Sequence, residues 1–205
     1  MTIAANLETE WRELLRRLAA LLALRGDRAL DAVRLDATHD ARLNSNVQPQ
    51  SLAVVGHFDR VLASGDAVTA PICSVLDRLK NELRWRQNAS YAGADFLDGY
   101  GYCELVGPSG HLRHPDVALG VLLLGPHVTY PEHAHPAAET YAVIAGRARW
   151  RQGDGVWRVR EPGERIDHAS MEPHAMSTAD EPLLAAYVWH DHLHEGARLL
   201  VDARH

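Results

Sequence analysis

A short segment of the chain carries metal-binding side chains at a spacing suited to one shared ion. His133 and His135 are separated by one residue, so in a β-strand their imidazoles point to the same face. Glu139 can add a carboxylate oxygen, and Gly146 completes an H-x-H-x3-E-x6-G pattern. Such a mixed set of nitrogen and oxygen ligands suits Zn, Fe, Mn, Ni or Co. We therefore expect one divalent metal ion at this segment.

Histidines are concentrated in the second half of the chain, where most of the 13 lie. His190, His192 and His194 would share one face if their segment is a strand, and they could then bind metal. They lack a spaced acid and turn, so we interpret the segment mainly as a strand end, with one member able to line a pocket. The terminal His205 has no evident partner. Any single histidine is better interpreted as solvated, so the prediction of a metal site depends on the combined set.

The elements that must position these residues change character near Asn88. Before it, apolar residues at steps of three and four mark one face of an amphipathic helix from Leu7 to Leu22. Gly26 is a plausible end for this helix. Further helices are expected over residues 27–35, 51–63 and 71–86, with a loop over residues 37–50.

After Asn88, short apolar stretches alternate with turns rich in glycine and proline, which is typical of an all-β sandwich or barrel. The expected strands cover residues 100–106, 117–124, 139–144, 148–152, 156–159 and 183–189. Gly153-Asp154-Gly155 separates two of them and predicts a β-hairpin. The chain should thus divide into a helical region, residues 1–87, and a β-barrel, residues 88–205. The helices either cover the barrel of their own subunit or form a dimer contact through Trp11 and the leucine face.

The composition excludes several classes of function. The 205 residues can form one buried core with an accessory element. A net charge of −6, without a basic stripe, argues against binding to nucleic acids or anionic membranes. Cys73 and Cys103 are far apart, as expected for reduced thiols in a cytoplasmic protein. The first residues do not resemble a secretion leader, and no apolar run is long enough to cross a membrane. We expect a small-molecule substrate and a possible homodimer.

The H-x-H-x3-E-x6-G pattern resembles the first motif of the cupin superfamily. The glycine usual before its first histidine would be Gly125, displaced by a short insertion in the turn. The second cupin motif supplies one more histidine after a turn, here Pro162-Gly163. His174 follows Pro173 and resembles that ligand, with His168 as the alternative. The resemblance implies a mainly β fold, in which a C-terminal cupin (double-stranded β-helix) barrel packs against an α-helical N-terminal half.

Two tyrosines make the sequence most similar to the cupin-type dimethylsulfoniopropionate (DMSP) lyases. Tyr130 precedes the histidine pair and Tyr141 lies two residues after the glutamate, and the resemblance covers about residues 100–190. It implies that four side chains hold the metal: His133, His135, Glu139 and His174. It also implies that Tyr141 is the general base and that Tyr130 binds or orients the substrate.

The implied reaction is a β-elimination that releases dimethyl sulfide and acrylate. The base removes the proton next to the substrate carboxylate, and a Lewis-acidic metal stabilises the negative charge that develops. A nearby cation lowers the high pKa of a tyrosine, which makes Tyr141 a usable base. Tyr187 and Trp189 could face the cationic sulfonium through cation–π contacts. The alternative for Tyr141 is a core tyrosine with a satisfied hydroxyl.

Two other classes of function remain compatible with the sequence. One is a different metal-dependent cupin enzyme, such as a dioxygenase, an isomerase or a lyase-like relative that acts on another carboxylate. The other is a non-enzymatic cupin that binds a small molecule. The N-terminal helices lack the basic patch that a DNA-binding sensor would need.

Overall fold

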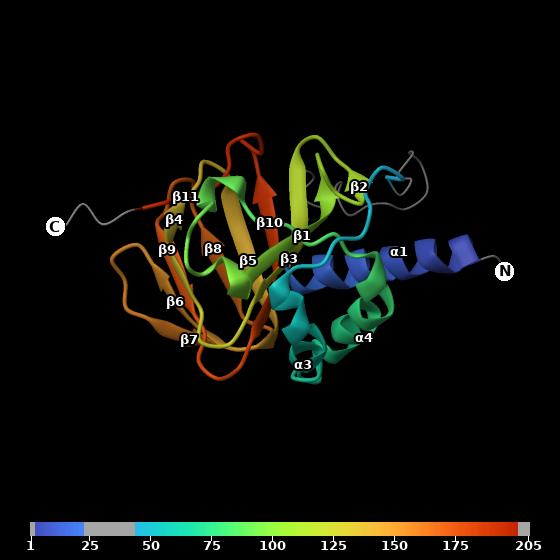
Figure 1. The fold of residues 1–205 in the computed structure, drawn as a ribbon, viewed down its shortest axis with the longest axis horizontal. Helices are drawn as coiled ribbons and strands as arrows, with labels where there is room; N and C mark the ends of the chain where they lie inside the picture. Colours follow the sequence, from blue (N-terminus) through green and yellow to red (C-terminus); the bar gives the residue numbers. More distant parts are fainter. Residues whose placement is uncertain (1–2, 23–43, 201–205) are drawn as a thin grey trace.

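The computed structural model describes residues 3–22 and 44–200, which form a helical layer and two facing β-sheets (Figure 1). The helix expected over residues 27–35, its neighbour Gly26, the first half of the loop expected over residues 37–50, and His205 lie outside the described residues. In the part that is described, no helix is long and apolar enough to cross a membrane.

The helical layer begins with α1 (Ile3–Leu21), whose apolar face is buried as its periodicity predicts. The remaining helical elements are η1 (Ala53–His57), α3 (Phe58–Leu62), α4 (Ala70–Leu79), η2 (Lys80–Glu82), η3 (Ala89–Tyr91) and η4 (Leu97–Gly99). The helix expected over residues 71–86 is therefore too long. Buried Leu83 and Trp85 alternate with Arg84 and Arg86, which is strand periodicity, and both arginines form isolated β-bridges.

The first sheet has the strand order β2-β1-β3-β10-β5-β8. Its strands are β1 (Tyr100–Gly107), β2 (Leu112–Arg113), β3 (Val117–Leu124), β5 (Ala138–Gly146), β8 (Arg165–His168) and β10 (Leu183–His190). The second sheet has the order β11-β4-β9-β6-β7. Its strands are β4 (Thr129–Ala134), β6 (Ala148–Gln152), β7 (Arg158–Arg160), β9 (His174–Ser177) and β11 (Arg198–Leu199). All six expected strands are present, with ends within two residues of those expected, and β6 pairs with β7 as the predicted hairpin.

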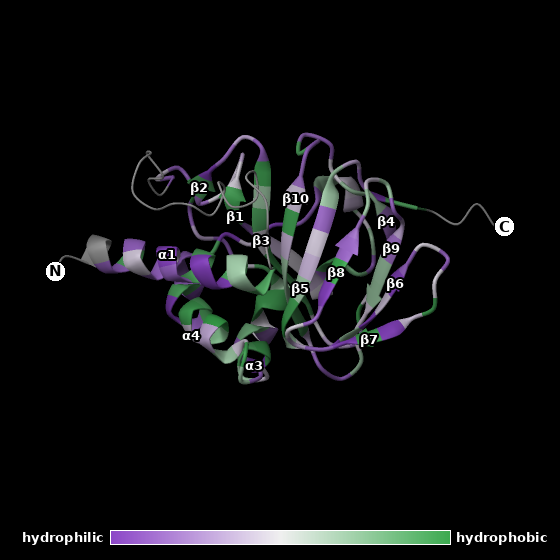
Figure 2. Ribbon diagram, turned by 180° about the vertical axis from the view of Figure 1, so that it is seen from behind, coloured by the Kyte–Doolittle hydropathy of each residue, from purple (hydrophilic) through white to green (hydrophobic). Residues whose placement is uncertain are grey.

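The first sheet is buried on both faces, which explains why β3 is apolar throughout. One face packs against α1, α3 and α4, and β3 contributes Leu119, Val121 and Leu123 to this core. The opposite face looks into the barrel, where Leu122 and Leu124 lie among aromatic side chains. Figure 2 shows the resulting hydrophobic character of β3 and β10. The expected fold, a mainly β cupin barrel with helices packed on it, is confirmed.

Candidate metal centre and its cavity

Four predicted side chains converge inside the barrel. His133 lies on β4 and is the cross-strand neighbour of His174 on β9. His135 directly follows β4, and Glu139 lies on β5. All four are at most 2% exposed. One ligand nitrogen of each histidine lies within 4.8 Å of the others, and Glu139 Oε2 is 2.9 Å from His135 Nε2 and 3.3 Å from His174 Nε2.

Main-chain carbonyl groups fix the orientation of all three imidazoles. The Nδ1 atoms of His133, His135 and His174 each donate to a carbonyl oxygen at 2.9 Å. The acceptors are the carbonyl oxygens of Pro131, Ala137 and Glu172. Because a carbonyl cannot donate, Nδ1 carries the proton, and the lone pair of each neutral ring lies on Nε2. Such contacts to the second ring nitrogen are typical of metal-binding histidines.

The donor set fits a cation. His174 Nε2 is buried and forms no hydrogen bond with any described residue. His135 already holds a proton on Nδ1, so its Nε2 can contact Glu139 only through a second proton or a shared cation. Burial opposes ionisation of Glu139, yet contacts with both histidines hold the pKa of this carboxyl below its ordinary value. Three lone pairs and one carboxylate oxygen thus face a common point, which suits a divalent metal.

His168, the alternative ligand, lies behind His174. The two rings stack with centroids 4.0 Å apart and an interplanar angle of 18°. His168 Nε2 accepts a hydrogen bond of 3.1 Å from the indole of Trp150, and its Nδ1 lies 3.4 Å from a Glu172 carboxylate oxygen. Its Nε2 lone pair is therefore already used, in contrast to that of His174.

The two predicted catalytic tyrosines are both buried next to this cluster. Tyr141 shares β5 with Glu139, two residues away, so both side chains face the barrel interior. Tyr130 stacks on His133 with ring centroids 3.9 Å apart, and its hydroxyl lies 2.8 Å from that of Tyr91. Burial raises the pKa of Tyr130 and of Tyr141 well above the ordinary value, and the Glu139 carboxylate adds to the effect on Tyr141. Both hydroxyls are therefore neutral when no cation is bound.

The two residues proposed to face a cation differ in their contacts. Tyr187 is paired with Tyr141 across β10 and β5 and lines the cavity. Trp189 also lines the cavity, but its indole N–H donates to Glu139 Oε1 and its ring stacks on His135 at 4.1 Å. Trp189 therefore restrains the histidine–glutamate cluster and also forms part of the cavity wall.

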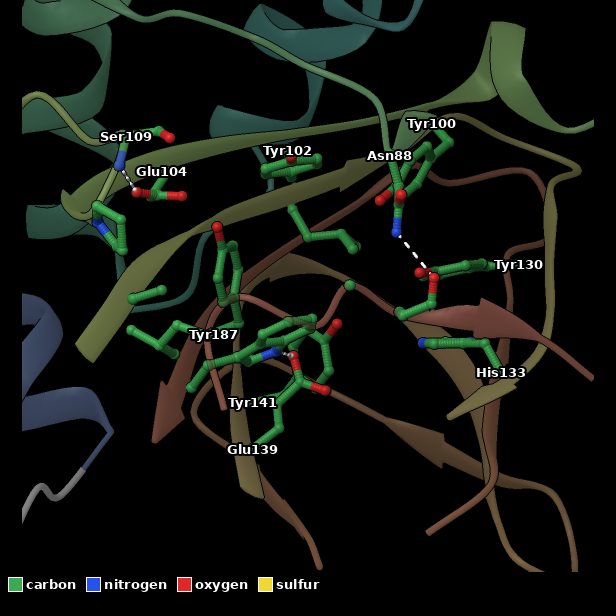
Figure 3. A pocket seen from close by; sticks show the side chains of 17 residues that line it. Asn88, Tyr100, Tyr102, Glu104, Ser109, Tyr130, His133, Glu139, Tyr141 and Tyr187 are labelled. Carbon is green, nitrogen blue, oxygen red and sulfur yellow. Dashed lines mark hydrogen bonds between the residues drawn. The ribbon is translucent and has the colours of Figure 1, made fainter. Parts of the chain in front are cut away.

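The cluster opens into a cavity of about 200 Å³ (Figure 3). Five of the six tyrosines of the chain line it, and the sixth, Tyr91, contacts Tyr130. Its described lining contains two carboxylates, Glu104 and Glu139, and neither lysine nor arginine. The cavity is thus aromatic and acidic, which favours a ligand with a positive group.

Sequence reasoning missed several cavity residues, Asn88, Tyr100, Tyr102 and Glu104, and also Tyr91, which contacts Tyr130. The alternation of Tyr100, Tyr102 and Glu104 along β1 was the available signal, because such residues share one face of a strand. Nothing local to β1 indicated that this face looks into the barrel.

The interpretation of residues 190–194 mainly as a strand end agrees with the structure, because β10 ends at His190, whereas the alternative of three histidines on one strand face is not met. Only His190 belongs to β10, and Asp191 and His192 adopt left-handed backbone angles (φ 60° and 48°) that turn the chain. His192 and His194 are exposed and lie near Glu195. The possible metal clusters among the described residues are confined to His133, His135 and His174.

The double-stranded β-helix with its buried cluster of three histidines and one glutamate defines the protein as a cupin. Within that class, the chain belongs to the dimethylsulfoniopropionate lyase family, whose sequence model matches residues 26–185. The resemblance to the DMSP lyase family that the sequence motifs indicated is thus confirmed.

Individual relatives agree with this family. The DMSP lyase DddQ of Ruegeria pomeroyi is 36% identical over 109 residues, which is 52% of this chain and 54% of DddQ. The putative DMSP lyase DddL of Cereibacter sphaeroides is 31% identical over 144 residues, 69% of this chain and 60% of DddL. The matched part thus spans less than two thirds of each of these curated relatives.

Solved structures extend the similarity over nearly the whole chain. The crystal structure of DddQ from Ruegeria pomeroyi superposes with a TM-score of 0.75 at 26% identity, covering 94% of this chain and 96% of that one. A structure reported with the DMSP lyases RdDddP and RnDddQII gives a TM-score of 0.77 at 27% identity, covering 95% and 100%.

Proposed function

We propose that this protein cleaves DMSP into dimethyl sulfide and acrylate by a metal-dependent β-elimination. The observation that carries the proposal is the position of Tyr141, which lines the same acidic, aromatic cavity as the histidine–glutamate cluster. A base and a cation site in one cavity are what removal of a proton next to a carboxylate requires. Membership of the DMSP lyase family supports the assignment of the substrate.

We assign the metal to His133, His135, Glu139 and His174. When bound there, a divalent cation would act as a Lewis acid for the substrate carboxylate and would favour the phenolate of Tyr141. The ligand types accept Zn, Fe, Mn, Ni or Co, so the native metal depends on supply and on fine geometry.

Tyr141 is the proposed general base. Its oxygen takes the proton from the carbon next to the substrate carboxylate, and the electrons of that C–H bond form the double bond of acrylate. The bond between the β-carbon and sulfur breaks, and its electron pair leaves with sulfur as neutral dimethyl sulfide. Charge is balanced, since the sulfonium gains an electron pair and the base gains a proton.

The remaining predicted residues position the substrate. Tyr130 is held between the Tyr91 hydroxyl and the His133 ring, so its own hydroxyl has a fixed place at the cavity wall. Tyr187 offers a ring for cation–π contact with the sulfonium, a contact of about 0.5–2 kcal/mol. Trp189 shares this role and restrains Glu139 through its indole N–H.

The proposal is tested by incubating the purified protein with DMSP and a panel of metals and measuring dimethyl sulfide in the headspace. We expect release that is abolished by a chelator and restored by metal. Tyr141→Phe should lower kcat by about 10²–10⁴-fold, the usual contribution of a general base. Metal content, measured by elemental analysis, should stay unchanged in this variant and serves as the control.

Two outcomes would contradict the proposal. Stoichiometric binding of metal without release of dimethyl sulfide would indicate another metal-dependent cupin enzyme. Full activity of Tyr141→Phe would mean that Tyr141 is a core residue and not the general base. Action in the cytoplasm and assembly as a homodimer remain predictions.

A further inference from the structure

Glu104 is a cavity carboxylate that the proposed reaction does not use. It lies on β1 and lines the same cavity as His133 and Glu139. In Figure 3 the hydroxyl of Tyr187 points toward Glu104, whereas Glu139 and Tyr141 lie near the other end of the Tyr187 ring. The cavity therefore has a second carboxylate, Glu104, which the Tyr187 ring separates from the histidine–glutamate cluster.

The local backbone is shaped to hold the Glu104 carboxylate in place. Its Oε1 accepts a hydrogen bond of 2.7 Å from the backbone N–H of Ser109. The pairing of β1 with β3 is shifted between Glu104 and Val106, and such bulges often redirect a side chain. Gly107 has a φ of 151°, and a Cβ there would lie 2.4 Å from Glu104 Oε1. Glycine at position 107 thus leaves the space that the carboxylate occupies.

The charge of Glu104 is only partly compensated. Burial raises the pKa of its carboxyl above the ordinary value, while the backbone N–H of Ser109 and the charge of Arg86 act in the opposite direction. Among the described residues, the Glu104 carboxylate is held by the Ser109 N–H and forms no ion pair. A partly buried carboxylate of this kind gains most from a cation that arrives with a ligand.

We propose that Glu104, with Tyr102 and Tyr187 beside it, binds the positive group of the substrate. The cavity would then select carboxylates that carry an onium group, sulfonium or quaternary ammonium, over carboxylates of the same shape that carry an uncharged alkyl group in its place. This inference rests on the proposed function, because it assumes that the substrate carboxylate binds at the proposed metal site.

The test uses two probes of the same shape and measures equilibrium binding to the metal-loaded protein by calorimetry. One probe is 3-(trimethylammonio)propanoate, and the other is 4,4-dimethylpentanoate, in which an uncharged tert-butyl group replaces the trimethylammonium group. We expect wild-type protein to prefer the onium probe. Glu104→Gln should weaken binding of the onium probe about tenfold, which corresponds to about 1.4 kcal/mol of lost charge interaction. Binding of the tert-butyl probe should change less than about twofold.

Glutamine suits this test because its carbonyl oxygen can still accept the Ser109 N–H, so the loop keeps its support. Glu82→Gln is the matched control, since it removes the same charge from an exposed position outside the cavity. Equal weakening of both probes, no weakening of either, or no onium preference in the wild type would overturn the role of Glu104. Failure of the proposed function has a different signature, namely a Glu104-dependent onium preference without any dimethyl sulfide from DMSP.

Discussion

His174 and His168 stack on one another but face different partners. His174 directs an Nε2 without a hydrogen bond toward Glu139, whereas the Nε2 of His168 accepts a hydrogen bond from the Trp150 indole. We therefore expect His174→Ala to weaken metal binding by at least about 100-fold, and His168→Gln by about 10-fold, the lower end of the range for side chains that support a metal ligand.

Titration of metal-free protein with Zn or Mn, followed by elemental analysis, measures both losses. His194→Ala serves as the control, because this histidine is exposed and outside the cluster. The reverse order of losses would make His168 the ligand and His174 the supporting ring.

The sequence predicted the convergence of His133, His135 and Glu139 because strand geometry turns a spacing of two residues into a shared face. Tyr91 and Glu104 could not be found in this way. Tyr91 belongs to a short 3-10 helix and reaches the site through its contact with Tyr130, whereas Glu104 lies on β1, which the order of the strands brings to the cavity. Local periodicity carries no information on which strands become neighbours.

At the scale of elements, the contact between β1, β3 and β10 depends on Gly120. A Cβ at this position would lie 2.2 Å from the Cys103 carbonyl oxygen and 2.6 Å from the Tyr187 hydroxyl. We expect Gly120→Ala to push β1 and the Tyr187 ring away and to cost about 1–3 kcal/mol of unfolding free energy. Binding of the onium probe should weaken in parallel.

Denaturant unfolding and probe titration check this expectation. Gly56→Ala is the matched control, because a Cβ at Gly56 meets no atom within 4 Å. If the two alanine variants were equally stable and bound the probe equally well, the close packing at Gly120 would have no energetic consequence.

The sequence predicted the long elements better than the short ones. β3 and β10 offer eight residues of apolar pattern each, and α1 repeats its apolar face over five turns. β8 and β9 have four residues each, too few to establish a period, and their pairing with β5 and β6 is settled by contacts far away in the sequence.

At the scale of the molecule, His111 lies where the helical layer meets the barrel. Its ring stacks on Trp11 of α1 at 4.6 Å, and its Nε2 accepts from the Arg84 N–H. Burial lowers the pKa of His111 to about 4. The unfolded chain, with an ordinary histidine pKa of about 6.5, therefore binds more protons between these values. Stability is fully present above about pH 6.5 and falls as the pH is lowered toward 4.

We expect His111 to make the unfolding free energy rise with pH within that window, with a slope approaching about 1.4 kcal/mol per pH unit. The measurement is urea unfolding of metal-free protein at several pH values, for wild type and His111→Gln. Burial lowers the pKa of His168 to about 4 as well, so only the difference between the two proteins reports on His111. Parallel stability curves would mean that this junction does not respond to protonation.

The three carbonyl acceptors behind the histidine rings have an evolutionary consequence. Since they belong to the peptide backbone, replacing the side chain at position 131, 137 or 172 leaves the acceptor oxygen in the chain. Substitutions nearby can thus accumulate without changing the tautomers, provided that the backbone keeps its path. Side chains behind the ligands can therefore vary while the orientation of the three imidazoles is kept, which would let one inherited centre serve relatives with different substrates.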